Sequence, residues 1–168
     1  MTSRSSRLRK AATSPILIGL MLLASCGAGR TLVMVPLSTS LRVASIEITE
    51  GPSTVTVPDD VKRGLKNKLQ ELLHKDGAFR KGQDLWLSYR FIQFNPGNQF
   101  TRWFWGGIGN AGEGSLTVEV KYFDGASREL STIHADGKIG SGFFGGSFDL
   151  AAGKVAEEIA DYTMRTFR

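Results

Sequence analysis

Cysteine and histidine are both scarce in this sequence. Among 168 residues there is one cysteine, Cys26, and there are two histidines, His74 and His134. A single cysteine excludes a disulfide bond within the chain, and the two histidines do not form a cluster at zinc-ligand spacing. No G-x-S-x-G nucleophile motif occurs, and no pattern pairs two acids for general acid–base work. We therefore expect a protein that is not an enzyme and that holds no metal.

Acidic residues are absent before Glu47, although the whole chain has 16 of them. The formal charge of +5 depends on four basic residues in the first ten positions, Arg4, Arg7, Arg9 and Lys10. From Cys26 onward the chain carries 17 basic and 16 acidic groups, a net charge of +1. A near-neutral domain has little electrostatic attraction for a phosphate backbone, so we expect no nucleic-acid partner.

A nucleotide-binding motif is also lacking, although two stretches match G-x-G-x-x-G, at residues 107–112 and 140–145. The first precedes a strand pattern instead of a helix, and neither belongs to a β-α-β unit with a ribose-binding acid. Such matches arise easily in a chain with 20 glycines. We expect two glycine-rich loops that bind no nucleotide and no other cofactor.

The apolar run near the N-terminus is too short to span a membrane. Residues 16–24 would rise about 13 Å as a helix, whereas the hydrocarbon core of a bilayer is about 30 Å thick. The run follows a basic stretch that ends at Lys10. This arrangement is typical of a secretory signal, whose apolar region needs about 7–15 residues.

The apolar run ends in a branched residue, two small residues and a cysteine: Leu23, Ala24, Ser25 and Cys26. This pattern resembles the lipobox of bacterial lipoproteins. The resemblance implies that the signal peptidase recognises residues 23–25 and cleaves before Cys26. It also implies that the cysteine carries a diacylglycerol and an amide-linked fatty acid such as palmitate. An ordinary signal with a chance cysteine is the alternative. Gly27 stands where an inner-membrane retention signal has Asp, which favours an outer-membrane anchor facing the periplasm over the inner membrane.

The sequence thus divides into a signal peptide (residues 1–25), a lipidated cysteine with its tether (26–40) and one envelope domain (41–168). The tether is rich in small and polar residues, although residues 32–35 could add a short strand. In the domain, Pro58 precedes a helix whose apolar stripe contains Val61, Leu65, Leu69 and Leu72. A last helix follows Asp149, with an expected buried face made of Leu150, Ala152, Val155, Ala156, Ile159 and Tyr162.

The strand patterns lie around and between these two helices. A β-rich segment surrounds Ile46, and a second strand runs over residues 85–94. The clearest alternation covers residues 116–122, where Leu116, Val118 and Val120 alternate with polar residues. Asp124-Gly125 is a turn signal, and a partner strand follows over residues 130–139. We therefore predict a two-layer α+β fold, with two helices on a mostly antiparallel sheet in the order β-α-β-β-β-α.

The most unusual stretch contains an arginine and three large aromatic residues, Arg102, Trp103, Phe104 and Trp105, directly before a glycine-rich loop. Phe143 and Phe144 in the other glycine-rich loop could lie beside them. Trp and Arg are enriched at binding hot spots, and Trp is also enriched at membrane interfaces. Three interpretations stay open: a cap over the end of the core, contact with a protein partner, or contact with lipid.

The second half of the chain resembles a family of bacterial lipoproteins, the domain of unknown function 4410 family. The resemblance covers about residues 41–166. It is carried by residues 89–94, Arg102, 106–114, 116–124, 140–146 and 149–162. This chain departs from the pattern by placing Trp-Phe-Trp directly before the first glycine-rich loop. The family implies an envelope lipoprotein and no catalytic activity.

Together these patterns predict a non-enzymatic, membrane-anchored envelope lipoprotein. It would act as an accessory or assembly subunit that contacts a protein partner through the aromatic stretch. The main alternative is a module that binds a small ligand or lipid, with a mouth lined by Phe104, Trp105, Phe143 and Phe144. A third class is an envelope hydrolase whose acids pair only in space.

Overall fold

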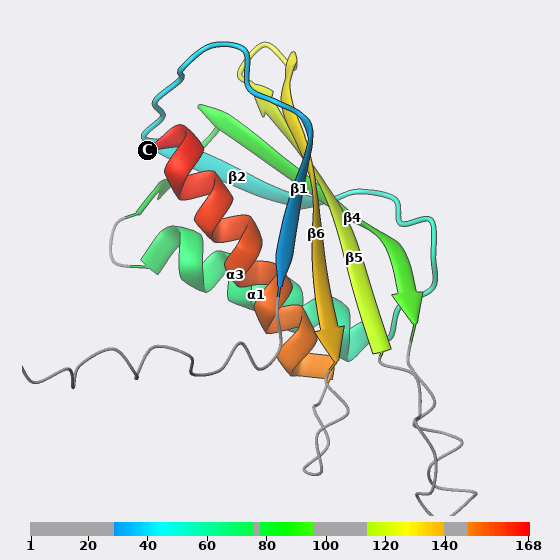
Figure 1. Cartoon of the computed structure of the whole chain (residues 1–168). Coiled ribbons are helices and arrows are strands. Elements are labelled where there is room, and N and C mark those ends of the chain that lie inside the picture. Colours follow the sequence, from blue (N-terminus) through cyan, green and yellow to red (C-terminus); the bar gives the residue numbers. More distant parts are fainter. Residues whose placement is uncertain (1–28, 76–77, 96–113, 140–147) are drawn as a thin grey trace, which may run out of the picture.

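The computed structural model describes residues 29–75, 78–95, 114–139 and 148–168 (Figure 1). These residues form a six-stranded sheet with two helices packed on one of its faces, which confirms the predicted α+β class and two-layer arrangement. The strand order is β1-β6-β5-β4-β2-β3. Strand β2 is parallel to β3 and β4, and the other neighbouring pairs are antiparallel.

The main elements follow the predicted order β-α-β-β-β-α. They are β2 (Ser45–Glu50), α1 (Asp59–His74), β4 (Leu85–Asn95), β5 (Gly114–Asp124), β6 (Glu129–Ile139) and α3 (Phe148–Phe167). Two short strands add to them: β1 (Arg30–Val35) and the two-residue β3 (Arg80–Lys81). Since β1 pairs with β6 along the edge of the sheet, the domain begins before residue 41. The predicted tether over residues 26–40 therefore contains a strand of the domain.

Helix α1 begins after Pro58, whose ring fixes φ near the helical value. Asp59 and Asp60 occupy its first turn, where carboxylates are stabilised by the helix dipole. Its buried stripe is Val61, Leu65, Leu69 and Leu73. Leu73 therefore takes the last buried position that the sequence pattern gave to Leu72, which is only partly buried. The step from Leu69 to Leu73 is four residues, so it keeps the stripe on one face of the helix.

Helix α3 lies close to the sheet because its contact face is built mainly from small residues. Ala151, Ala152, Ala156 and Ala160 are buried there. The prediction for Leu150 was wrong, because its side chain is 61% exposed and Ala151 takes the buried position instead.

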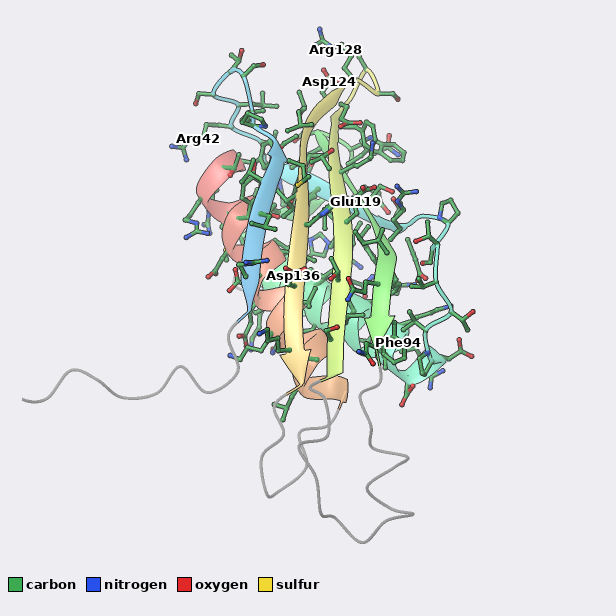
Figure 2. The ribbon with its side chains drawn as sticks, turned by 45° about the vertical axis from the view of Figure 1, so that its right-hand side comes forward. Arg42, Phe94, Glu119, Asp124, Arg128 and Asp136 are labelled. Carbon is green, nitrogen blue, oxygen red and sulfur yellow. The ribbon has the colours of Figure 1, made fainter. Side chains whose placement is uncertain are left out.

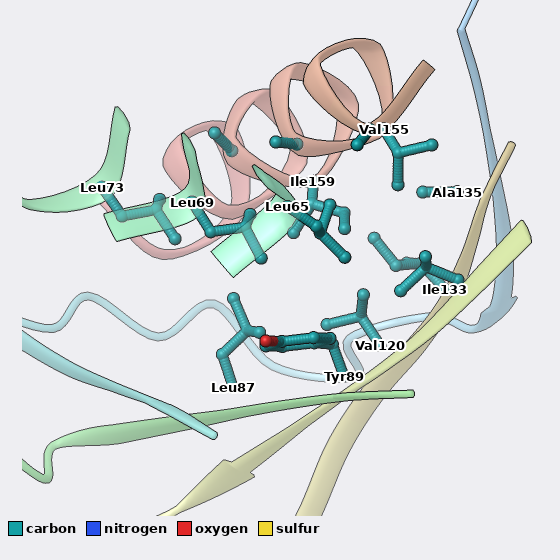
Figure 3. Packing of buried hydrophobic residues seen from close by; sticks show 14 of the residues in the cluster. Leu65, Leu69, Leu73, Leu87, Tyr89, Val120, Ile133, Ala135, Val155 and Ile159 are labelled. Atoms are coloured by element: carbon teal, nitrogen blue, oxygen red, sulfur yellow. The ribbon is translucent and has the colours of Figure 1, made fainter. Parts of the chain in front are cut away.

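The hydrophobic core fills the layer between the helices and the sheet (Figure 3). Alternate residues of each central strand point into this layer. They include Leu87 and Tyr89 from β4, Val120 from β5, and Ile133 from β6, all of which are buried. The other face of these three strands carries mainly polar and charged side chains, together with the cross-strand pair Trp86 and Phe123. We call it the open face.

Candidate interaction surfaces

One end of the sheet gathers the ends of several elements, and we call it the lower end because it lies at the bottom of Figure 1. Strand β4 ends there at Asn95, β5 begins at Gly114 and β6 ends at Ile139. Asn95 is paired with Ser115, and Gly114 with Ile139. Helix α3 begins at the same end, at Phe148. Figure 2 shows Phe94 at this end, opposite the β5–β6 turn.

Strand β1 also begins at the lower end, since Arg30 pairs with Asp136 near the end of β6. Gly29, just before it, lies against Glu158 of α3. The chain segments 96–113 and 140–147, and the segment that precedes residue 29, are thus all joined to one end of the domain. This clustering follows from the up-and-down course of β4, β5 and β6.

None of the site residues predicted from the sequence belongs to the described part of the structure. Cys26 and the cleavage motif precede residue 29, and the aromatic stretch and the phenylalanine pair fall within the two segments joined to the lower end. Those outside the described residues are Leu23, Ala24, Ser25, Cys26, Arg102, Trp103, Phe104, Trp105, Phe143 and Phe144. The residues that flank these two segments are described. Asn95 and Gly114 flank the first, Ile139 and Phe148 flank the second, and all four lie at the same end of the sheet.

The open face carries a charged row that crosses three strands. Arg90 of β4, Glu119 of β5 and His134 of β6 are direct cross-strand neighbours. The Arg90 Nε donates a hydrogen bond to Glu119 Oε1 at 2.8 Å, and His134 Nε2 lies 3.4 Å from Glu119 Oε2. Lys121 pairs with Glu129 at 2.9 Å on the same sheet. These charges therefore largely neutralise one another.

The ionisation of Glu119 is set by two opposing effects. Burial of its carboxyl group acts to raise the pKa, since its side chain is only 13% exposed. The hydrogen bonds from Arg90 and His134 act in the opposite direction and outweigh burial, so that the pKa lies below the usual value of a glutamate. Glu119 is thus held as a carboxylate and ties β4 to β6 across the open face.

The polar row ends at an apolar edge strand. His134 is paired with Leu32 of β1, and β1 continues through Val33, Met34 and Val35. All four of these side chains are exposed, Met34 to 54%. The strand is held in place from α3 and β6: Thr31 donates a hydrogen bond to Glu158, and Ser131 donates one to the Val35 carbonyl. The sequence allowed a short strand over residues 32–35 but was not interpreted as an exposed apolar surface. The strand signal was the β-branched residues Thr31, Val33 and Val35 among apolar neighbours.

Two further features are absent from the described residues, a cluster of metal ligands and a helix able to span a membrane. Within the described ranges, no three His, Cys, Asp or Glu side chains are close enough together to hold a metal ion. None of the helices in that part of the chain is both long and apolar enough to cross a membrane. The surfaces that remain are the lower end, the open face and the β1 edge.

These observations define the class of structure. It is a two-layer domain with its helices on one face of a mixed sheet and with its chain segments gathered at one end. The family model described as "Domain of unknown function (DUF4410)" matches residues 49–142. The chain belongs to this family, as the sequence resemblance predicted. A search of curated proteins finds no match.

Solved structures of PelC share the fold at low sequence identity. A PelC dodecamer from Paraburkholderia phytofirmans matches with a TM-score of 0.52 and 12% identity, covering 84% of this chain and 99% of that chain. A single-residue variant of the same dodecamer matches with a TM-score of 0.50 and 13% identity, covering 84% and 98%. A minor lipoprotein from Acinetobacter baumannii matches with a TM-score of 0.38 and 12% identity, covering 72% and 91%.

Proposed function

We propose that this chain is a non-enzymatic lipoprotein of the bacterial cell envelope, anchored through lipid on Cys26 and acting as an accessory or assembly subunit. The proposal places the anchor in the outer membrane, facing the periplasm, because Gly27 replaces the Asp of the retention pattern. It assigns no catalytic residue, metal or cofactor other than the covalent lipid. Membership of the DUF4410 family supports it.

The observation that carries the proposal is the clustering at the lower end. The chain leaves Gly29 toward Cys26 from this end, and the segments that contain Trp105 and Phe144 start and finish there. A lipid on Cys26 would therefore hold the aromatic segments near the membrane surface. A partner that meets them would itself lie in or on that membrane.

A subunit role also agrees with the shape of the described domain. Its core is filled by side chains of the sheet and helices, and its charged open face is paired internally. The fold is compatible with assembly, since PelC, which shares it, forms dodecamers. Recognition is therefore assigned to the segments that the scaffold carries, as is common for loops on rigid elements.

The anchor is tested by metabolic labelling of cells with a clickable palmitate analogue. The full-length chain should take up the label and sediment with the outer membrane. The Cys26→Ala variant should lose the label and leave the membrane fraction. Label that persists in the variant would refute acylation at this residue.

The partner is tested by site-specific photo-crosslinking in cells. One chain carries the photoreactive residue in place of Trp105. The control carries it in place of Lys66, which is exposed on α1. A discrete protein adduct at position 105 and none at position 66 is expected, and the adduct mass identifies the partner. Lipid adducts alone, or no adduct, would contradict contact with a protein partner.

A substitution complements the crosslink. Trp103→Ala combined with Trp105→Ala should abolish the adduct formed from a probe at Phe104, while the unfolding transition of the purified chain stays unchanged. A persisting adduct would show that the partner is held by other residues.

A further inference from the structure

The most apolar exposed surface of the described domain is the outer flank of β1. Six large hydrophobic residues are exposed in the described residues, and four of them are consecutive in this strand: Leu32, Val33, Met34 and Val35. A fifth, Leu150, lies in the first turn of α3, at the lower end where β1 also begins. Edge strands are usually protected by charged residues or by covering segments, and these four positions carry no charge.

The chain before β1 limits where this flank can lie. Gly29 is held beside Glu158, and Cys26 is three residues earlier. Three residues at full extension span about 11 Å. If Cys26 carries its lipid, as the proposed function requires, the start of β1 lies within about this distance of the membrane surface.

From these observations we infer that the β1 flank is a membrane-contact surface and that the tethered domain rests on the lipid headgroups along this strand. The inference rests on the proposed function for the location of the anchor. The partner is the bilayer surface itself, with the apolar side chains at the boundary between headgroups and acyl chains.

The chemistry of the strand suits a shallow contact. Its side chains alternate between the two faces of the sheet, so both sets project beside a backbone edge that pairs with no other strand of the described residues. Those backbone groups need hydrogen bonds, which water and headgroups supply and hydrocarbon does not. Arg30 pairs with Asp136 at 3.2 Å and stays 68% exposed at the start of the strand, where a cation suits lipid phosphate.

A second copy of this chain fits the flank less well. Two β1 strands paired antiparallel would place their lower ends about 20 Å apart, the length of six strand residues. If the paired strands stood upright on the membrane, the reach of about 11 Å from Gly29 to the anchor would be shorter than this separation, so both anchors could not enter one membrane. Parallel pairing would bring the two Arg30 side chains together. Neither constraint applies to lipid.

The test is photo-crosslinking of the full chain in its native membrane, with a diazirine amino acid in place of Met34. Matched probes replace Lys66 and Gln70, both exposed on α1. Intact-mass spectrometry then reads two features of each chain separately: acylation at Cys26 and the photo-adduct. We expect a phospholipid adduct at position 34 and little at positions 66 and 70.

Every other pattern overturns the inference. A dimer adduct would assign the flank to a second copy, and an adduct of another mass would assign it to a different protein. No adduct would mean that the flank faces water. Equal lipid adducts at positions 34, 66 and 70 would show proximity without a preferred face. An unacylated chain would refute the proposed anchor at Cys26. The photo-adduct at position 34 is a separate mass change, so it would still report whether the β1 flank contacts lipid.

A variant makes the result quantitative. Leu32→Thr with Val35→Thr keeps residues that favour strands and removes apolar contact on both sides of the probe. Each buried methylene changes a partition constant roughly fourfold, so the lipid adduct at position 34 should fall at least about fourfold. An unchanged yield in a folded variant would refute contact through these side chains.

Discussion

Gly137 controls how closely α3 can approach the sheet. It lies on the helix-facing side of β6, and a Cβ built there would stand 2.7 Å from the carbonyl oxygen of Ala151 and 2.7 Å from Cγ2 of Val155. Ordinary carbon–carbon contacts are about 3.5–4.0 Å. The oxygen belongs to the helix backbone, and valine in a helix has one strongly preferred rotamer. Neither neighbour can move cheaply, so Gly137→Ala must push α3 away from β6.

The expected cost of Gly137→Ala is about 1–3 kcal/mol of unfolding free energy, the range for overpacked cores. Gly153→Ala is the matched change within α3 itself, where an added Cβ meets nothing within 4 Å. It should stabilise the domain by about 0.5–1 kcal/mol, since alanine favours the helix over glycine. Both values come from urea unfolding of the purified chain, followed by circular dichroism. If Gly137→Ala were as stable as the parent, the close packing of α3 on β6 would be refuted.

Two further predictions concern the strands. Ser127 has φ of 61° in the β5–β6 turn, and glycine adopts this region without a steric penalty, so Ser127→Gly should raise the unfolding free energy by about 0.5–1 kcal/mol. A loss of stability in the same urea assay would contradict that turn geometry. The lowered pKa of Glu119 means that the folded chain keeps this carboxylate ionised at a pH where the unfolded chain binds a proton. The contribution of Glu119 to the unfolding free energy is fully present above the ordinary glutamate pKa of about 4.3. It is lost as the pH falls through the lowered pKa of the folded chain. Glu119→Gln should therefore reduce the loss of stability between pH 6 and pH 3, and an unchanged pH profile would refute the assignment.

Much of the fold could be predicted because its elements carry regular patterns. Leu116, Val118 and Val120 alternate strictly with polar residues, and all three are buried in β5. The four-residue steps of Val61, Leu65 and Leu69 likewise define the buried face of α1. Such periodicity depends on which residues face the core, so it survives in the sequence without knowledge of the partners.

Errors arose where two neighbouring apolar residues compete for one buried position. Leu73 is buried and Leu72 is only partly so, and Ala151 is buried while Leu150 is exposed. Hydrophobicity alone favours leucine over alanine. At the start of α3 the decisive quantity is space, because the helix backbone approaches Gly137 closely. That proximity is a tertiary property, and no local pattern reveals it.

Strand β1 was placed in the predicted tether, which allowed a short strand over residues 32–35, for a related reason. An edge strand has only one neighbouring strand, and its side chains stay partly exposed on both faces of the sheet. Leu32, Val33 and Met34 therefore do not alternate between apolar and polar. Its pairing with β6 links residues about 100 positions apart. The candidate site residues stay predictions, since the aromatic stretch and Cys26 lie outside the described residues.

The topology of the sheet bears on the proposed role of the chain as an anchored subunit. Strands β4 and β6 end, and β5 begins, at the end where β1 starts. Any lipid attached shortly before Gly29 would therefore hold this end of the sheet near the membrane. The scaffold's contribution is to hold that end rigidly, with α3 packed on β6 through Gly137 and β1 tied to α3 through Thr31 and Glu158. If α3 is displaced by Gly137→Ala, its contact with Thr31 through Glu158 is displaced as well, so the crosslink at position 34 should respond to a substitution that does not touch that residue.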